Sequence, residues 1–265
     1  MIAMKYHPFP PVLCVAVVLT GCGPGPARQA ETMPAVPIFG ENFTETDPAK
    51  DWSGPRPSTH PVHGIDISTW QGRIDWPTAR DNGVNFAFIK ATEGSDRVDP
   101  AFAANWSAAA AAGVPRGAYH FFYNCGAADQ QARWFIDHVP RAAAALPPAL
   151  DMEWTPRSPT CPGKRPGDQV RADARRFLTM VQDQYGKRPI LYTTVDFFEE
   201  NQMWRLGGVD FWLRSTAAHP SASYPGQEWT FWQYSGTGAV PGIKGQVDLN
   251  AFSGNRSDWT RWLAQ

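Results

Sequence analysis

The chain has 265 residues, a length typical of one large domain or of two small ones. Its 24 lysine and arginine residues nearly balance 25 aspartate and glutamate residues, and the formal net charge is −1. This balance gives no basic surface for nucleic acid, so a nucleic-acid-binding protein is disfavoured. Twelve tryptophans and fifteen phenylalanines are enough for a large core and leave some aromatic side chains to line a groove.

Residues 1–22 have the layout of a secretory signal peptide. Lys5 precedes an apolar stretch from Pro11 to Leu19, which is too short to span a membrane in the mature protein. The stretch closes with Leu-Thr-Gly-Cys, which resembles a bacterial lipobox with Cys22 as the lipidated first residue. A plain signal peptide with a chance cysteine is the alternative. We therefore expect an exported protein that is lipid-anchored at the cell envelope and faces the periplasm. The sequence does not distinguish an anchor in the inner membrane from one in the outer membrane.

Residues 23–61 are rich in proline, glycine and polar residues and have no sustained hydrophobic period. This composition predicts a flexible linker between the anchor and a folded domain over 62–265.

Two cysteines, Cys125 and Cys161, fall within the predicted domain. In an exported chain they suggest one disulfide, with two free thiols as the alternative. A zinc site is disfavoured because no second cysteine pair and no suitably spaced histidines accompany them.

From residue 62 onward, strand-like segments alternate with helical ones. The predicted strands are 62–68, 85–94, 115–123, 147–154, 188–194, 209–216, 229–235 and 245–252. Helices are predicted over 74–83, 99–113, 127–139, 166–186 and about 196–204.

The first five strands each precede a helix, which implies parallel pairing with right-handed crossovers. An open doubly wound sheet is one solution. A closed TIM-like β/α barrel with eight strands and an incomplete ring of about five helices fits the count better. No glycine-rich phosphate loop follows the first strand, so a nucleotide-binding fold has little support.

In such a barrel the functional side chains collect at the carboxyl ends of the strands. Acids fall there on several predicted strands, namely Asp66, Glu93, Asp151, Glu153 and Asp248. Side chains alternate along a strand, so Asp151 and Glu153 face the same side, which in a barrel is the lumen. Two neighbouring carboxylates beside an apolar wall repel, and at least one pKa is expected to rise. A protonated and an ionised carboxyl together suit glycosidic bond cleavage.

The segment from about residue 62 to 252 resembles glycoside hydrolase family 25, the Chalaropsis-type lysozymes. These enzymes cleave peptidoglycan between N-acetylmuramic acid and N-acetylglucosamine. The matching motifs occur in the family's order: GIDIS with QGRIDW, FAFIKATEG with DPAFAANWSAAAAAG, GAYHFF, PPALDMEW, PILYTT, and FWQYSGTGAVPGIKGQVDLNAF. The pattern departs from the family at Arg214, where a small residue is usual, and this change is expected to alter the groove.

The resemblance implies roles for individual residues. Glu153 matches the general acid, and Asp151 matches a carboxylate that stabilises the oxocarbenium-like state or orients the substrate's acetamido group. Asp66 and Asp248 match two further active-site aspartates. We expect substrate-binding side chains at Tyr119, His120, Tyr192, Gln233 and Trp70. For His120 a packed histidine is nearly as good an interpretation, and Glu93 fits a loop-organising role better than a chemical one.

The predicted function is therefore a monomeric lysozyme that acts on peptidoglycan glycan strands and needs no metal or cofactor. A retaining, an inverting and a substrate-assisted mechanism all stay open. The alternative from another class is a non-catalytic, lipid-anchored peptidoglycan-binding protein, which the presence of all the acids disfavours. A chitinase-like barrel is disfavoured because RAAAALPPAL lacks the upstream aspartates of that family.

Overall fold

The computed structural model describes residues 44–45 and 52–265. Ten strands form one sheet, and closure between β8 and β9 turns eight of them into a barrel. The barrel order is β9-β10-β2-β3-β5-β6-β7-β8. Its strands are β2 (His63–Ile67), β3 (Phe86–Glu93), β5 (Arg116–Phe121), β6 (Ala149–Met152), β7 (Ile190–Thr193), β8 (Asp210–Arg214), β9 (Phe231–Ala239) and β10 (Val247–Phe252). The predicted eight-stranded barrel is confirmed.

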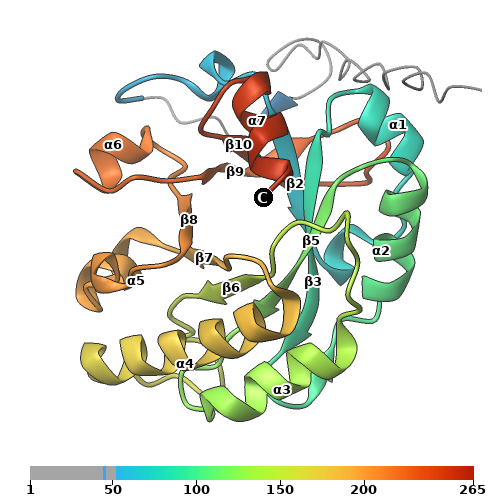
Figure 1. Ribbon diagram of the computed structural model, residues 1–265. Helices are drawn as coiled ribbons and strands as arrows, with labels where there is room; N and C mark the ends of the chain where they lie inside the picture. Colours follow the sequence, from blue (N-terminus) through green and yellow to red (C-terminus); the bar gives the residue numbers. More distant parts are fainter. Residues whose placement is uncertain (1–43, 46–51) are drawn as a thin grey trace, which may run out of the picture. The chain divides into compact units, whose positions relative to one another are not determined.

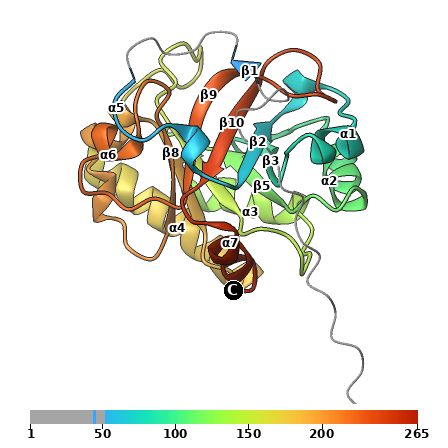
Figure 2. The ribbon, with the colours of Figure 1, turned by 90° about the horizontal axis from the view of Figure 1, so that it is seen from above.

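One strand departs from the expected parallel pairing. β10 runs antiparallel to both of its neighbours, β2 and β9. The other seven barrel strands, in the order β2, β3, β5, β6, β7, β8 and β9, each run parallel to the next one. The short connection 240–246 explains the difference, because it is long enough for a hairpin but not for a helical crossover. Since β10 is reversed, its first residues lie at the same rim as the carboxyl ends of the other strands. Figure 2 shows β9, β10 and β2 side by side.

Five helices follow the first five barrel strands, as the sequence pattern predicts. They are α1 (Trp76–Asp81), α2 (Phe102–Ala111), α3 (Ala128–His138), α4 (Gly167–Tyr185) and α5 (Val195–Glu200), and they lie outside the strands in Figure 1. Two further helices, α6 (Pro220–Ser223) and α7 (Arg256–Leu263), were not predicted. The shorter elements are β1 (Thr44–Glu45), β4 (Arg97–Val98), and the 3-10 turns η1 (Pro57–Thr59), η2 (Thr69–Gln71) and η3 (Met203–Arg205). No helix in the described part of the chain has both the length and the apolar character that crossing a membrane requires.

The longest helix, α4, shows how local sequence produces the outer layer. Its buried residues Val170, Ala174, Phe177, Leu178 and Val181 recur at three- and four-residue spacing, which places them on one face. The helix ends at Gly186, whose φ of 68° lies in the left-handed region that glycine adopts without strain. The apolar face packs toward the barrel.

Aromatic side chains fill the lower part of the barrel lumen. The rings of Phe88 and Trp212 stack with centroids 4.4 Å apart. The backbone at Gly64 lies so close to Phe86 that a Cβ there would be 2.5 Å from the ring, which explains the glycine. Helix α7 closes this end of the barrel with Trp259, which is fully buried and lies 5.3 Å from the Phe86 ring. The aromatic side chains and Trp259 therefore close the barrel at this end, so solvent reaches the polar rim only from the opposite end.

Residues 52–61 fall in the stretch predicted to be a flexible linker, yet they pack against the outer side of β9. The ring of Trp52 lies 5.6 Å from that of Trp232, and the ring of His60 lies 5.9 Å from it. Ser53 also bridges to Ala218. No helix connects β9 to β10, so this segment covers the face that a complete helical ring would protect. The packed part of the chain thus begins before residue 62, within the segment whose composition predicts a linker.

Candidate active site

The carboxylates predicted from the strand ends lie at the rim that carries the carboxyl ends of the parallel strands. Asp66 is directly opposite Asp248 in the β2–β10 pairing. Asp151 is in register with Tyr192 of β7, and Glu153 follows immediately after β6. Asp66 and Asp151 are only 6% and 8% exposed. The alternation of side chains along the strands therefore brings the predicted acids together.

A hydrogen-bond network fixes Asp66. The Oδ1 atom of Asp66 accepts hydrogen bonds from Gln233 Nε2 at 2.9 Å and from Asn250 Nδ2 at 2.7 Å. Trp212 Nε1 donates to Asn250 Oδ1 at 2.7 Å. Tyr192 donates its hydroxyl to Gln233 Oε1 at 2.9 Å. Every one of these side chains is buried, so the aspartate is held in one orientation.

Two members of this network, Trp212 and Asn250, were not among the predicted site residues. For Asn250 a signal existed, because it lies two positions after Asp248 on a strand and so shares its face. Trp212 lies within the apolar part of β8 and reads as a core residue.

Burial raises the pKa of both Asp66 and Asp248. Hydrogen bonds from Asn250, Gln233 and Asp248 oppose this rise at Asp66, whereas the negative charge of Asp66 adds to it at Asp248. The two carboxyls therefore titrate as a coupled pair, and burial favours the retention of a proton by the pair.

Asp151 and Glu153 form the second carboxyl pair. Burial is the largest cause of the raised pKa at each, and the charge of Glu153 raises that of Asp151 further. The Oδ1 atom of Asp151 is buried and has no hydrogen-bond partner within residues 44–45 and 52–265. A buried carboxyl oxygen without a partner is rare in folded proteins and suggests a position for a ligand group or a retained proton.

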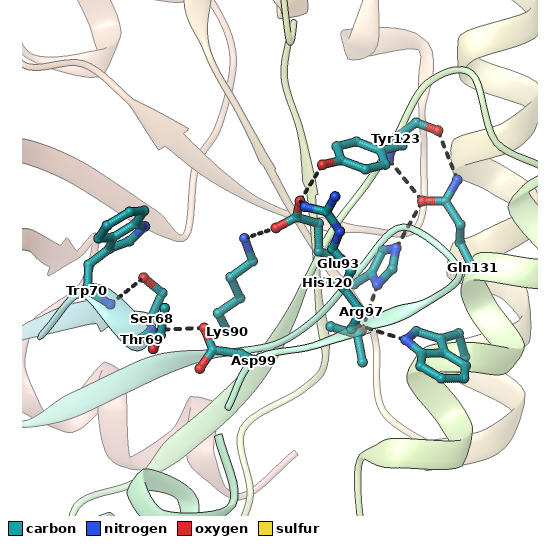
Figure 3. Close-up of polar contacts among 12 residues, drawn as sticks. Ser68, Thr69, Trp70, Lys90, Glu93, Arg97, Asp99, His120, Tyr123 and Gln131 are labelled. Carbon is teal, nitrogen blue, oxygen red and sulfur yellow. Dashed lines mark hydrogen bonds and ion pairs between the residues drawn. The ribbon is translucent and has the colours of Figure 1, made fainter. Parts of the chain in front are cut away.

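Two cations act on these acids. Lys90 of β3 lowers the pKa of both Asp151 and Glu153, and Arg214 of β8 lowers that of Glu153. Lys90 Nζ lies 2.5 Å from Glu93 Oε2, and Glu93 also accepts hydrogen bonds from Tyr123 and Arg97 (Figure 3). Glu93 thus organises the loop after β3, and Lys90 is a site residue that the sequence analysis missed. No group of three or more His, Cys, Asp or Glu side chains in the described residues has the arrangement of a metal site.

His120 does not reach the rim, contrary to its predicted substrate-binding role. It is fully buried, and its ring nitrogens contact Thr92 Oγ1 at 2.7 Å and Gln131 Oε1 at 3.1 Å (Figure 3). Its ring also stacks on Phe177 of α4. Neighbouring residues on a strand point to opposite sides, and Tyr119 faces the lumen, where its ring contacts Trp212. His120 therefore belongs to the packing between barrel and helices.

The tryptophans separate into different environments. Trp70 lies in η2 just after β2 and is 88% exposed, which leaves its ring available to a sugar. Trp232 is fully buried on the outer side of β9. Trp154 packs against Phe197 and donates to Glu200, so it supports α5 beside the site.

Cys125 and Cys161 form the predicted disulfide, with Cα atoms 5.6 Å apart. Cys125 follows β5 and Cys161 follows β6, and these strands are parallel neighbours whose loops emerge at the rim. The bond ties the loop that carries Glu153 to the loop that carries Asn124, whose Nδ2 donates to the Glu153 carbonyl.

Replacing both cysteines by serine is expected to destabilise this rim. The bond joins residues 36 apart, for which loop-closure entropy gives about 3 to 4 kcal/mol of stability. We expect a lower midpoint in urea and proteolytic cleavage within 155–166 at denaturant concentrations where the barrel is still folded. Identical urea midpoints and protease patterns for the oxidised protein and the double variant would rule out this bracing role.

The family assignment follows from sequence comparison. Residues 65–243 match the model of glycosyl hydrolases family 25. The chain belongs to glycosyl hydrolase family 25. As a member of this family it is a glycoside hydrolase, and peptidoglycan is the substrate class that the family implies.

Relatives of this family 25 enzyme include lysozyme M1 of Streptomyces globisporus, which is 36% identical over 209 residues that cover 74% of this chain and 69% of the lysozyme. The Escherichia coli K12 protein YegX is 39% identical over 215 residues, which cover 78% of this chain and 75% of YegX. The structure of a family 25 glycosyl hydrolase from Bacillus anthracis superposes with a TM-score of 0.73 at 32% identity, covering 81% of this chain and 99% of that one.

Proposed function

We propose that this enzyme is an N-acetylmuramidase, which cleaves the β-1,4 bond between N-acetylmuramic acid and N-acetylglucosamine in peptidoglycan. The observation that carries the proposal is the carboxyl pair of Asp151 and Glu153. Both acids have a raised pKa, and Asp151 Oδ1 has no partner among the described residues. A raised pKa lets one of the pair retain a proton at a pH where an ordinary carboxyl is ionised, and a protonated carboxyl is what general acid catalysis at a glycosidic oxygen requires.

Substrate binding decides which carboxyl holds the proton. Without substrate, the deeper burial of Asp151 and the nearby charge of Glu153 raise the pKa of Asp151, which favours a proton on Asp151 in this proposal. An acetamido N–H of the substrate that donates to Asp151 Oδ1 would stabilise the ionised form of Asp151. The proton then passes to Glu153, which is the general acid in this proposal and protonates the leaving oxygen.

The pair of Asp66 and Asp248 serves a different role in the proposed reaction. Asp66 is fixed by two side-chain amides and retains its position as charge develops at the sugar ring. A preorganised carboxylate stabilises an oxocarbenium-like transition state without having to reorient during the reaction.

The decisive experiment is digestion of purified peptidoglycan by the mature protein, followed by borohydride reduction and mass spectrometry of the products. A muramidase leaves N-acetylmuramitol at the new reducing ends. Products that end in N-acetylglucosaminitol would refute the bond assignment, and binding without any cleavage would favour a non-catalytic peptidoglycan-binding protein.

We also propose that the enzyme is exported and anchored through a lipid on Cys22. This residue lies outside the described residues, and the proposal is supported by the lipobox-like sequence and by the disulfide, which is typical of an oxidising compartment. Cys22→Ser is expected to move the protein from the membrane fraction to the soluble fraction. An unacylated mass for the mature wild-type protein would contradict the anchor.

A further inference from the structure

Arg214 is the last residue of β8 and lies at the rim of the barrel. Trp212, two positions earlier on the same strand, faces the lumen, where it stacks on Phe88. Arg214 therefore points to the lumen as well. Its cross-strand partner is Gln233, the residue that donates to Asp66. The guanidinium thus lies in the same site as the acids.

The guanidinium of Arg214 is half-buried but has no hydrogen bond or ion pair with any described residue, whereas its backbone carbonyl accepts from the Tyr224 hydroxyl. The other cation of the site, Lys90, is paired with Glu93 at 2.5 Å. The charge of Arg214 lowers the pKa of Asp66, Glu153 and Asp248 without a hydrogen bond or ion pair to any of them. A planar group with five N–H donors is thus left with its donors available to a ligand.

A glycine rather than a side chain lies beside this guanidinium. Gly236 of β9 is exposed, and a Cβ there would be 3.3 Å from Asp248 Oδ1 and 4.0 Å from Arg214 Nη2. The absence of a side chain at Gly236 leaves the Arg214 fork open to a group that enters next to the reacting sugar. Burial raises the pKa of both Asp66 and Asp248, which reduces the negative charge that such a group meets.

We propose that Arg214 is a specificity-determining residue that binds the lactyl carboxylate of a muramyl residue. This inference rests on the proposed muramidase function. A muramyl residue carries a lactyl ether whose carboxyl group is free where the stem peptide has been removed and is a neutral amide where the stem is present. The guanidinium fork matches a free carboxylate with two parallel hydrogen bonds, whereas an amide offers a single oxygen. The enzyme therefore prefers glycan strands that lack stem peptides.

The test compares kcat/KM for two substrates, glycan strands stripped of peptides by an amidase and the same strands with their stems. Arg214→Gln should lower kcat/KM on stripped strands about tenfold more than on stem-bearing strands, and mainly through KM, because any effect of the lost charge on Glu153 is common to both substrates. Arg214→Lys should fall between Arg214→Gln and the wild type, because it keeps the charge and loses the fork. Arg133→Gln, on the exposed face of α3, is the matched control.

Two results would overturn the inference. Equal losses on both substrates, with a shifted pH profile, would mean that Arg214 acts through the acids. A larger loss on stem-bearing strands would place the recognised carboxylate on the peptide. Circular dichroism and Tm confirm that each variant is folded, and the lysine variant keeps the test valid if the glutamine variant is not. Failure of the wild type to cleave either substrate would instead contradict the proposed muramidase function.

Discussion

Glu153→Gln is expected to reduce peptidoglycan hydrolysis on the order of a thousandfold and to leave the fold intact. The substitution keeps the shape of the side chain but removes the proton that general acid catalysis supplies, which contributes about 10² to 10⁴ in rate. The fold should tolerate it because the Glu153 carboxyl makes no hydrogen bond with another described residue. The measurements are initial rates of muropeptide release and the Tm of both proteins.

The control for this variant is Glu228→Gln, because Glu228 is an exposed acid in the loop before β9. It should have wild-type activity. A folded Glu153→Gln protein with near-normal activity would show that another residue protonates the leaving group.

Asp151→Asn is expected to lower kcat/KM by about a hundredfold, the effect typical of a misplaced reacting group. It should also shift the pH profile. In the substrate complex of the proposed reaction Asp151 is ionised and repels the negative charge of ionised Glu153, so removing the Asp151 charge lowers the pKa of Glu153 in that complex. Activity requires protonated Glu153 and is lost as pH rises through that pKa, so the high-pH limb should move to lower pH.

The measurement is kcat from about pH 4 to 9, because the pH dependence of kcat reports the pKa values of the substrate complex. Asp183→Asn on the exposed surface of α4 is the control and should keep both the rate and the profile. A high-pH limb that stays in place in Asp151→Asn would show that the two carboxyls are not coupled in the working enzyme.

Local pattern was sufficient to predict most of the strands and the acids of the rim. Parallel strands deliver their carboxyl ends to one rim, and the alternation along β6 places Asp151 toward the lumen, so neither inference needs a distant contact. By the same alternation rule, the adjacent residues Tyr119 and His120 cannot both face the lumen. For His120 the rule favours the packed histidine, the alternative interpretation, over the substrate-binding role.

Other features depend on contacts that local pattern does not contain. The reversal of β10 follows from the short connection 240–246, but whether such a strand pairs with β2 is decided by closure of the whole sheet. Trp52 is an aromatic residue in a proline-rich segment, and nothing in that segment indicates its packing partner. It packs on the outer face of β9, which no helix of the described residues covers. Helix α7 had a local signal, the reciprocal capping of Asn255 and Asp258, although its place beneath the lumen depends on Trp259.

The neighbouring position of β2 and β10 also governs when the enzyme becomes active. These are the first and last strands of the barrel, and the hydrogen bond from Asn250 to Asp66 joins residues 184 positions apart. Contacts at such separation form late, because the entropy of closing the intervening chain must be overcome before they contribute. If the chain is exported unfolded, as proposed above, it carries no assembled acid cluster until its last strand has emerged, and the hydrolase becomes active only after export.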